Sequence, residues 1–158
     1  MSGIYKTNHF RIEELVYPEF YEAHKHRGIQ IWMALNPLAL MTLDALRERF
    51  GSTTVNNWLW GGPFKYSGLR PMDCEEGADL SIHKFGGGFD PKFKDVTADE
   101  VRADMRRCGC MNPNVNRSSL PLRYRYIRRI EEFPGMSWFH FDTGNWDVEK
   151  YGVRVVGG

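Results

Sequence analysis

Hydrophobic positions along the chain fall into short, separated groups, and the clearest helical group covers residues 37–50. Its apolar side chains form one broad stripe, and the charged residues 47–49 lie outside that stripe. Asn36 suits the N-cap, Pro37 the first helical position and Gly51 the C-terminal cap. This pattern predicts a helix that contributes to the core.

The other elements are shorter. The sequence Thr97-Ala98-Asp99-Glu100 has the spacing of a capping box and predicts a helix that continues to about Arg107. Residues 10–22 predict a short helix or turn, then a second one after Pro18, and residues 112–119 predict a polar loop. Strands are expected at Thr53–Trp60, Tyr124–Phe133, Trp138–Asp142 and Val153–Val156. No repeat or linker divides the chain, so residues 1–158 predict a single α+β domain with a small antiparallel sheet and packed helices.

Composition and charge indicate a globular protein and argue against a nucleic-acid-binding function. The chain has 158 residues, of which 42% are hydrophobic and 14% aromatic, as in globular proteins with a real core. Its formal charge is only +1, and basic and acidic residues are interspersed. This balance provides no electrostatic footprint for nucleic acid, so no nucleic-acid partner is expected. The densest basic stretch, residues 123–129, is interpreted as a solvated face.

Neither end of the chain nor its apolar segments predict a membrane partner. Residues 1–8 lack the apolar region of a secretory signal, and the apolar stretch 31–41 is too short to span a bilayer and is broken by Asn36 and Pro37. We therefore expect synthesis in a cytoplasm. The cysteines are Cys74, Cys108 and Cys110, an odd number that predicts free thiols rather than a disulfide framework or a metal site. His24 and His26 lie in a charged segment and are expected to be solvated.

Two segments carry the candidate chemistry. Residues 81–90 read Ser-Ile-His-Lys-Phe-Gly-Gly-Gly-Phe-Asp and place His83 seven positions before Asp90, and His140 follows far downstream. Two imidazoles and one carboxylate are ligands of the kind that catalytic zinc uses, and three protein ligands leave a fourth position open for water. The glycines between His83 and Asp90 allow the backbone to turn sharply. We therefore predict an open zinc site that activates water.

Strand geometry adds a role for Asp142. Side chains alternate along a strand, so His140 and Asp142 should share one face while Phe139 and Phe141 anchor the opposite face in the core. A carboxylate two residues from a ligand histidine can accept a hydrogen bond from the imidazole and orient it.

In this order, these residues resemble the motifs of the hedgehog-like D-alanyl-D-alanine peptidase family of zinc peptidases, which includes phage and bacterial enzymes that cleave peptidoglycan. The family motif S-x-H-x-x-G-x-x-x-D falls on residues 81–90, W-x-H falls on residues 138–140, and S-G-x-R falls on residues 67–70. The resemblance covers roughly residues 10–142. It implies that His83, Asp90 and His140 hold Zn²⁺.

The resemblance also implies that Arg70 binds substrate and stabilises developing negative charge, which suits the fixed donors of a guanidinium. Two positions depart from the family pattern: Gly88 replaces a usual alanine, and Ser137 replaces the carboxylate that several relatives carry three residues before the last histidine. A serine cannot accept a proton at neutral pH. The candidates for the general base are therefore Glu132, Glu131 and Asp142, with Glu132 preferred.

We expect a zinc peptidase that acts on the peptides of bacterial peptidoglycan, either as a phage lysis enzyme or as a wall-degrading component of a virion. Such a protein would be made in the host cytoplasm and would act in the wall or periplasm after release, or travel with other virion proteins. An alternative is a non-catalytic phage structural or assembly protein that keeps the fold. A weaker alternative is a protein-binding module that uses exposed aromatic side chains.

Overall fold

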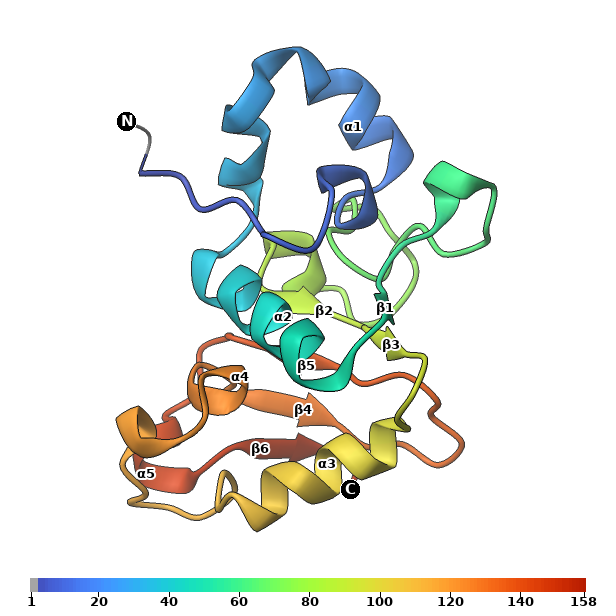
Figure 1. The fold of residues 1–158 in the computed structure, drawn as a ribbon. Helices are drawn as coiled ribbons and strands as arrows, with labels where there is room; N and C mark the ends of the chain where they lie inside the picture. Colours follow the sequence, from blue (N-terminus) through green and yellow to red (C-terminus); the bar gives the residue numbers. More distant parts are fainter. Residues whose placement is uncertain (1–2) are drawn as a thin grey trace.

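The computed structural model describes residues 3–158 and combines helices with small sheets, which confirms the α+β class (Figure 1). The N-terminal helices lie at the top of Figure 1, and the larger sheet and the C-terminal helices lie below them. With η marking 3-10 helices, the elements in chain order are η1 (Ile12–Glu14), α1 (Pro18–His24), η2 (Lys25–Ala34), α2 (Pro37–Phe50), β1 (Thr53–Thr54), η3 (Trp58–Trp60), η4 (Ile82–Phe85), β2 (Gly88–Phe89), β3 (Lys92–Phe93), α3 (Ala98–Arg107), η5 (Arg117–Ser119), α4 (Leu122–Arg125), β4 (Arg129–Glu131), β5 (Phe141–Asp142), α5 (Val148–Tyr151) and β6 (Arg154–Val156).

The larger sheet has the strand order β2-β5-β4-β6. Strand β5 pairs antiparallel with both of its neighbours, as expected for a small antiparallel sheet. Strand β6, however, runs parallel to β4, because the chain returns through α5 after β5 and then enters β6 in the direction of β4. A second, two-stranded sheet pairs β1 with β3. The larger sheet brings the chain after η4 next to the strand that follows His140.

The two best-marked helices form as predicted. Helix α2 covers Pro37–Phe50, and the side-chain oxygen of Asn36 accepts hydrogen bonds from the amides of Leu38 (2.9 Å) and Ala39 (3.3 Å). Helix α3 begins after Thr97, and Thr97 and Glu100 exchange the two hydrogen bonds of a capping box. These signals are local, so the sequence alone was sufficient to place both helices.

The predicted strand at Thr53–Trp60 is wrong beyond its first two residues, because residues 58–60 form η3 instead. The reason lies in the side chain of Asn56, which is fully buried. Its amide nitrogen donates to the carbonyl of Val16 (3.1 Å), and its oxygen accepts from the amide of Ser67 (2.9 Å). Asn56 thus joins two distant loops and ends the strand.

The predicted strands at Tyr124–Phe133 and Trp138–Asp142 are also shorter than expected. Tyr124 belongs to α4, and its hydroxyl donates to Asp104 on α3 (2.6 Å), which favours a helical turn at this point. The alternation predicted after residue 138 does hold for the core, since Phe139 and Phe141 are fully buried. The short final strand predicted at Val153–Val156 corresponds to β6.

Helix α2 packs against α4 and supplies much of the core, together with the strands of the larger sheet. Among the described residues, no single helix is long and apolar enough to cross a membrane. The segments Pro18–Ala34 and Pro37–Phe50 meet length and composition criteria only as a pair that is bent by 88°. The largest fully buried apolar side chains belong to Leu15, Leu40, Leu43, Leu46, Phe89, Met105, Tyr124, Ile127, Ile130, Phe139 and Phe141.

Candidate metal centre

His83 is presented by a short, tightly capped turn. The Ser81 hydroxyl accepts from the amide of His83 (3.4 Å) at the start of η4, and Gly86 ends η4 in the left-handed conformation with φ of 74°. A Cβ at Gly86 would lie 2.0 Å from the carbonyl oxygen of Ala34, so both the backbone angle and the close contact require glycine. At Gly88, where the peptidases that the motif resembles usually carry alanine, a side-chain carbon of Ile82 lies only 2.7 Å from the position that a Cβ would take.

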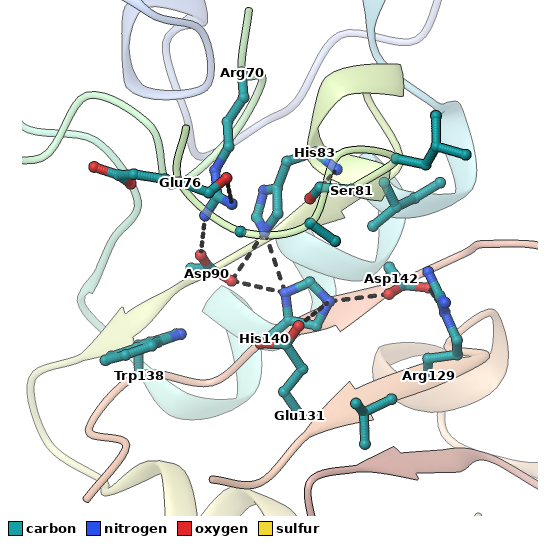
Figure 2. Close-up of a pocket in the computed structure, with 15 residues that line it drawn as sticks. Arg70, Glu76, Ser81, His83, Asp90, Arg129, Glu131, Trp138, His140 and Asp142 are labelled. Atoms are coloured by element: carbon teal, nitrogen blue, oxygen red, sulfur yellow. Dashed lines mark hydrogen bonds and ion pairs between the residues drawn. The ribbon is translucent and has the colours of Figure 1, made fainter. Parts of the chain in front are cut away.

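The three predicted ligands converge. Oδ1 of Asp90 lies 3.2 Å from Nε2 of His83 and 2.8 Å from Nδ1 of His140, and these two nitrogens are 3.2 Å apart (Figure 2). All three side chains are buried. Ligands about 2.0–2.1 Å from zinc in a tetrahedron lie about 3.3 Å from one another, so this triangle has nearly the size that zinc requires.

Hydrogen bonds on the far side of each ring direct the correct nitrogen to the centre. Nδ1 of His83 lies 3.0 Å from the carbonyl oxygen of Gly68, so it carries the proton and leaves the lone pair on Nε2. Nε2 of His140 lies 2.9 Å from Oδ2 of Asp142 and donates to it, so Nδ1 is the nitrogen of that ring that would meet a bound metal ion. Metal-binding histidines characteristically have such partners, which fix the tautomer and the ring orientation. Asp142 therefore takes the orienting position that the sequence predicts.

Asp142 is itself held in place. Its Oδ1 accepts from Nε of Arg129 (3.0 Å) and from the amide of Gly144 (3.0 Å), and the residue is only 2% exposed. Burial alone would raise the pKa of this carboxyl, but the hydrogen bond and the charge of His140 and the contact with Arg129 lower it. Both oxygens are engaged, so Asp142 is suited to orient His140 and has no free oxygen to accept a proton from water.

The electrostatics of the centre favour a bound cation. Burial would raise the pKa of Asp90, but the imidazoles of His83 and His140 hold it far below its usual range. Burial would lower the pKa of His140, yet its hydrogen bonds with Asp142 and Asp90 raise it. Carboxylates thus surround His140 on both sides and attract positive charge to the place where the ligand atoms meet.

Arg70 reaches the same carboxylate from the other side. Its Nη2 lies 3.0 Å from Oδ2 of Asp90, while its Nε donates to the carbonyl of Tyr66 (2.7 Å) and its Nη1 to the carbonyl of Glu76 (3.3 Å). These contacts use three of the five N–H donors of a guanidinium, which leaves two for a ligand in the cavity. The structure thus brings Arg70 to the candidate site.

A cavity of about 410 Å³ opens over the ligand cluster and includes Arg70, Glu131 and Trp138 in its lining. A smaller adjoining cavity of about 220 Å³ shares Arg70, Asp90 and Trp138 with it and is lined further by the aromatic rings of Phe64 and Tyr66. The buried ligands therefore face a space large enough for a peptide segment (Figure 2).

The two glutamates at the end of β4 lie in different surroundings. Ile130 is fully buried, so strand alternation directs Glu131 towards the cavity, where its Oε1 lies 4.0 Å from Nε2 of His140. Glu132 forms an ion pair with Arg106 and lines a separate cavity near the C-terminus. The sequence favoured Glu132 as general base, but the structure places Glu131, and not Glu132, beside the ligand cluster.

The other residues considered as site candidates lie outside the ligand cluster, and two residues that the sequence did not indicate line its cavity. Ser137 is exposed and lines another cavity, at the start of α3, so the position at which several peptidases of the resemblance carry a carboxylate lies away from this centre. His24, His26, Cys108 and Cys110 are not part of the ligand cluster. Arg129 and the loop residue Glu76 line the cavity without having been singled out. Arg129 shares a strand face with Glu131, but the mixed hydrophobic pattern of residues 124–133 gives no sequence signal for that face.

Comparisons with known proteins do not assign this chain to a family. No protein-family model matches the chain. No curated protein matches it. No solved structure matches it. The function must therefore be argued from the residues and geometry of this centre.

Proposed function

We propose that this chain is a zinc-dependent peptidase that hydrolyses peptide bonds of bacterial peptidoglycan. The observation that carries the proposal is the convergence of His83, Asp90 and His140 within 4.8 Å of one another at the base of an open cavity. Two neutral imidazoles and one carboxylate, with a side open to the cavity, are the ligand set of catalytic rather than structural zinc. A bound zinc ion would polarise a scissile carbonyl and make water more acidic.

The surrounding residues have roles that follow from their contacts. Asp142 and the carbonyl of Gly68 orient the two imidazoles, and Arg70 orients Asp90. The two unused N–H groups of Arg70 can donate to a substrate carboxylate or to the oxygen that becomes negative in the transition state.

Glu131 is our proposal for the general base. Its side chain is about one-third exposed at the cavity and forms no ion pair with an arginine or lysine among residues 3–158, so its carboxylate is available to accept a proton from water and pass it to the leaving amine. Glu132 lacks this freedom, because Arg106 holds it elsewhere.

The substrate class rests on the resemblance of residues 67–70, 81–90 and 138–140 to the motifs of peptidoglycan peptidases. We propose stem or cross-link peptides of the wall as the substrate, with a D-amino acid near the cut. The setting that we propose is a phage lysis enzyme, or a wall-degrading enzyme carried in a virion beside other virion proteins.

The test is incubation of the zinc-loaded protein with purified cell walls, followed by measurement of newly released amino groups. We expect release that is abolished by a chelator, restored by zinc, and absent in the His83→Ala variant. His26→Ala is the matched control, because His26 is exposed and lies outside the ligand cluster. Stoichiometric zinc binding without release from any wall preparation would overturn the peptidase proposal.

That outcome would favour the alternative of a non-catalytic phage structural or assembly protein. The observation behind this alternative is that Ser137 occupies the position of the usual base and lies away from the centre. In such a protein the metal would stabilise the fold, so zinc removal would lower the unfolding temperature although no turnover exists to be lost.

A further inference from the structure

A second cavity, about 510 Å³ in volume, lies apart from the metal centre and has walls rich in arginine. Its lining comes from the starts of α2 and α5, from η5 and the residue before it, and from α4 and the segment between α4 and β4. It shares no residue with the cavity over the candidate zinc ligands. In Figure 1, α4 and α5 both lie at the left of the view. We call this space the arginine cavity; its polar lining is Asn116, Arg117, Ser118, Arg125, Arg128 and Glu149.

Arg117 and Arg125 differ from most other buried or half-buried arginines of the chain, and the exposed Arg128 lies beside them in the cavity. Among residues 3–158, none of the three forms an ion pair with a carboxylate. Elsewhere such pairs are common, and they join Arg70 to Asp90, Arg102 to Asp99, Arg123 to Asp104 and Arg129 to Asp142. The basic stretch 123–129 is therefore not a uniformly solvated face: two of its arginines are neutralised by partners, and Arg125 and Arg128 line the arginine cavity.

Arg117 is the most unusual of the three, because it is only 7% exposed. Its Nη1 donates to the carbonyl of Cys110 (2.9 Å) and its Nη2 to the carbonyl of Val148 (3.2 Å), whereas its buried Nε has no hydrogen-bond partner. Burial lowers the pKa of Arg117 because water is removed, and the charges of Cys110 and of the exposed Glu149 offset this only in part. A buried cation that forms no ion pair with a carboxylate is costly, and a bound anion would reduce that cost.

Arg125 shows the same deficiency. Its Nη2 donates to the carbonyl of Leu120 (3.1 Å), but its buried Nε has no partner. Arg128 is exposed at the cavity and has its donors free for a ligand. Leu38 also lines the cavity, so the N-terminal end of the 14-residue helix α2 lies at the edge and adds positive potential. Glu149 is the one acidic residue of the lining, and it is exposed.

We propose that the arginine cavity binds an oxyanion of the phosphate type, held by the guanidinium groups of Arg117, Arg125 and Arg128. Guanidinium groups present paired N–H donors that match two oxygens of a phosphate, and such charge-assisted bonds are about twice as strong as neutral ones. This site does not depend on the proposed peptidase activity. The proposal gives a ligand-binding role to Arg125 and Arg128, for which the sequence predicted only a solvated face.

The test uses the ¹⁵N-labelled, zinc-loaded full chain titrated with inorganic phosphate at constant ionic strength, with chloride as the reference anion. We expect saturable shifts in the amide signals of residues 116–118 and in the Nε–H signal of Arg117. Arg125→Gln and Arg128→Gln should each weaken phosphate binding about tenfold, the loss of one charge-assisted hydrogen bond. Arg49→Gln is the matched control, because Arg49 is exposed, forms no ion pair within residues 3–158 and does not line this cavity; it should bind phosphate as the wild type does.

Three results would overturn the proposal: no saturation with phosphate, an equal loss of affinity in Arg49→Gln, or shifts confined to residues 81–90 and 140–142, which would place phosphate at the metal centre. A parallel titration with a short poly(glycerol phosphate) identifies the source of the anion. Tighter binding of the polymer than of inorganic phosphate indicates a phosphodiester chain, and equal or weaker binding indicates free phosphate. The site itself is supported by either of these two results.

Discussion

Arg70 and Asp90 are joined through the one carboxylate oxygen that the histidines do not use. Nη2 of Arg70 lies 3.0 Å from Oδ2 of Asp90, whereas Oδ1 of the same carboxylate faces both His83 and His140. The arginine that family resemblance assigns to substrate therefore also positions a candidate metal ligand. These two roles make different predictions for metal affinity.

Arg70→Ala should weaken zinc binding about 10–100-fold, because removal of a hydrogen-bond partner leaves the ligand carboxylate less well oriented. Competition with a chromophoric chelator measures the zinc affinity directly. Arg70→Lys should recover part of this loss, since an ammonium can still reach one oxygen. An unchanged zinc affinity in Arg70→Ala, combined with a loss of activity, would restrict Arg70 to contact with the substrate.

Asp142→Asn should also lower zinc affinity by about 10–100-fold, although the two side chains have nearly the same shape. Asp142 accepts from Nε2 of His140 and keeps the lone pair on Nδ1, and an amide at this place no longer selects that tautomer by its charge. Chelator competition again gives the affinity, and the ¹⁵N signals of the imidazole report the tautomer. An unaltered tautomer and affinity would show that the backbone alone positions His140.

Glu131→Gln and Glu132→Gln form a matched pair that tests the general base. We expect Glu131→Gln to retain zinc and to lose about 10²–10⁴-fold in the rate of wall hydrolysis, because an amide cannot accept the proton. Glu132→Gln should keep the rate, since Glu132 pairs with Arg106 outside the cavity. The reverse result in the rate of amino-group release would restore Glu132 to the mechanism and remove Glu131.

Asp104→Asn should destabilise the fold by about 1–3 kcal/mol at pH 7. The carboxylate accepts from the Tyr124 hydroxyl (2.6 Å) and from Arg123 (3.1 Å), and although burial would raise the pKa of Asp104, these partners lower it. A lowered pKa in the folded state stabilises the protein above the unfolded value of about 3.9, and this contribution is lost as pH falls through the folded value. In urea unfolding, the difference in stability between the variant and the wild type should be largest at pH 7 and should shrink as pH falls below about 3.9.

Cys110 should resist alkylation in the native protein, whereas Cys74 and Cys108 should react. Burial raises the pKa of the Cys110 thiol to about 12, and the residue is fully buried, so neither the thiolate nor access for a reagent is available at neutral pH. Cys74 and Cys108 are half-buried. Mass spectrometry of peptides after native and denatured labelling with iodoacetamide distinguishes the three thiols, and rapid native labelling of Cys110 would contradict the packing around it.

The parts of the fold that the sequence predicted are those whose signals are local. Helices α2 and α3 were placed because Asn36, Thr97 and Glu100 cap their own helices. The strand expected at residues 53–60 failed because Asn56 bonds to Val16 and Ser67, which are distant in sequence. Such contacts exist only after the chain has folded, and propensity cannot reveal them.

The same distinction applies to the site. The ligands His83, Asp90 and His140 were predicted from the order and spacing of their motifs, and the structure brings them together. The choice between Glu131 and Glu132 depends on which residue of β4 faces the core, and the mixed pattern around Ile130 left this open. Because side chains alternate along a strand, a shift of one residue moves every side chain to the opposite face of the sheet.

The contact between the turn at Gly86 and the segment before α2 has a consequence for engineering. The amide of Asn36 donates to the carbonyl of Gly86 (2.9 Å), the amide of Leu69 donates to the carbonyl of Leu15 (2.9 Å), and Ala34 leaves no room for a side chain at Gly86. The first third of the chain thus packs against the loops that carry His83 and Arg70 and fixes their positions through these contacts. A chimera that grafts residues 67–142 onto another N-terminal half would inherit the ligands without the support that aligns them.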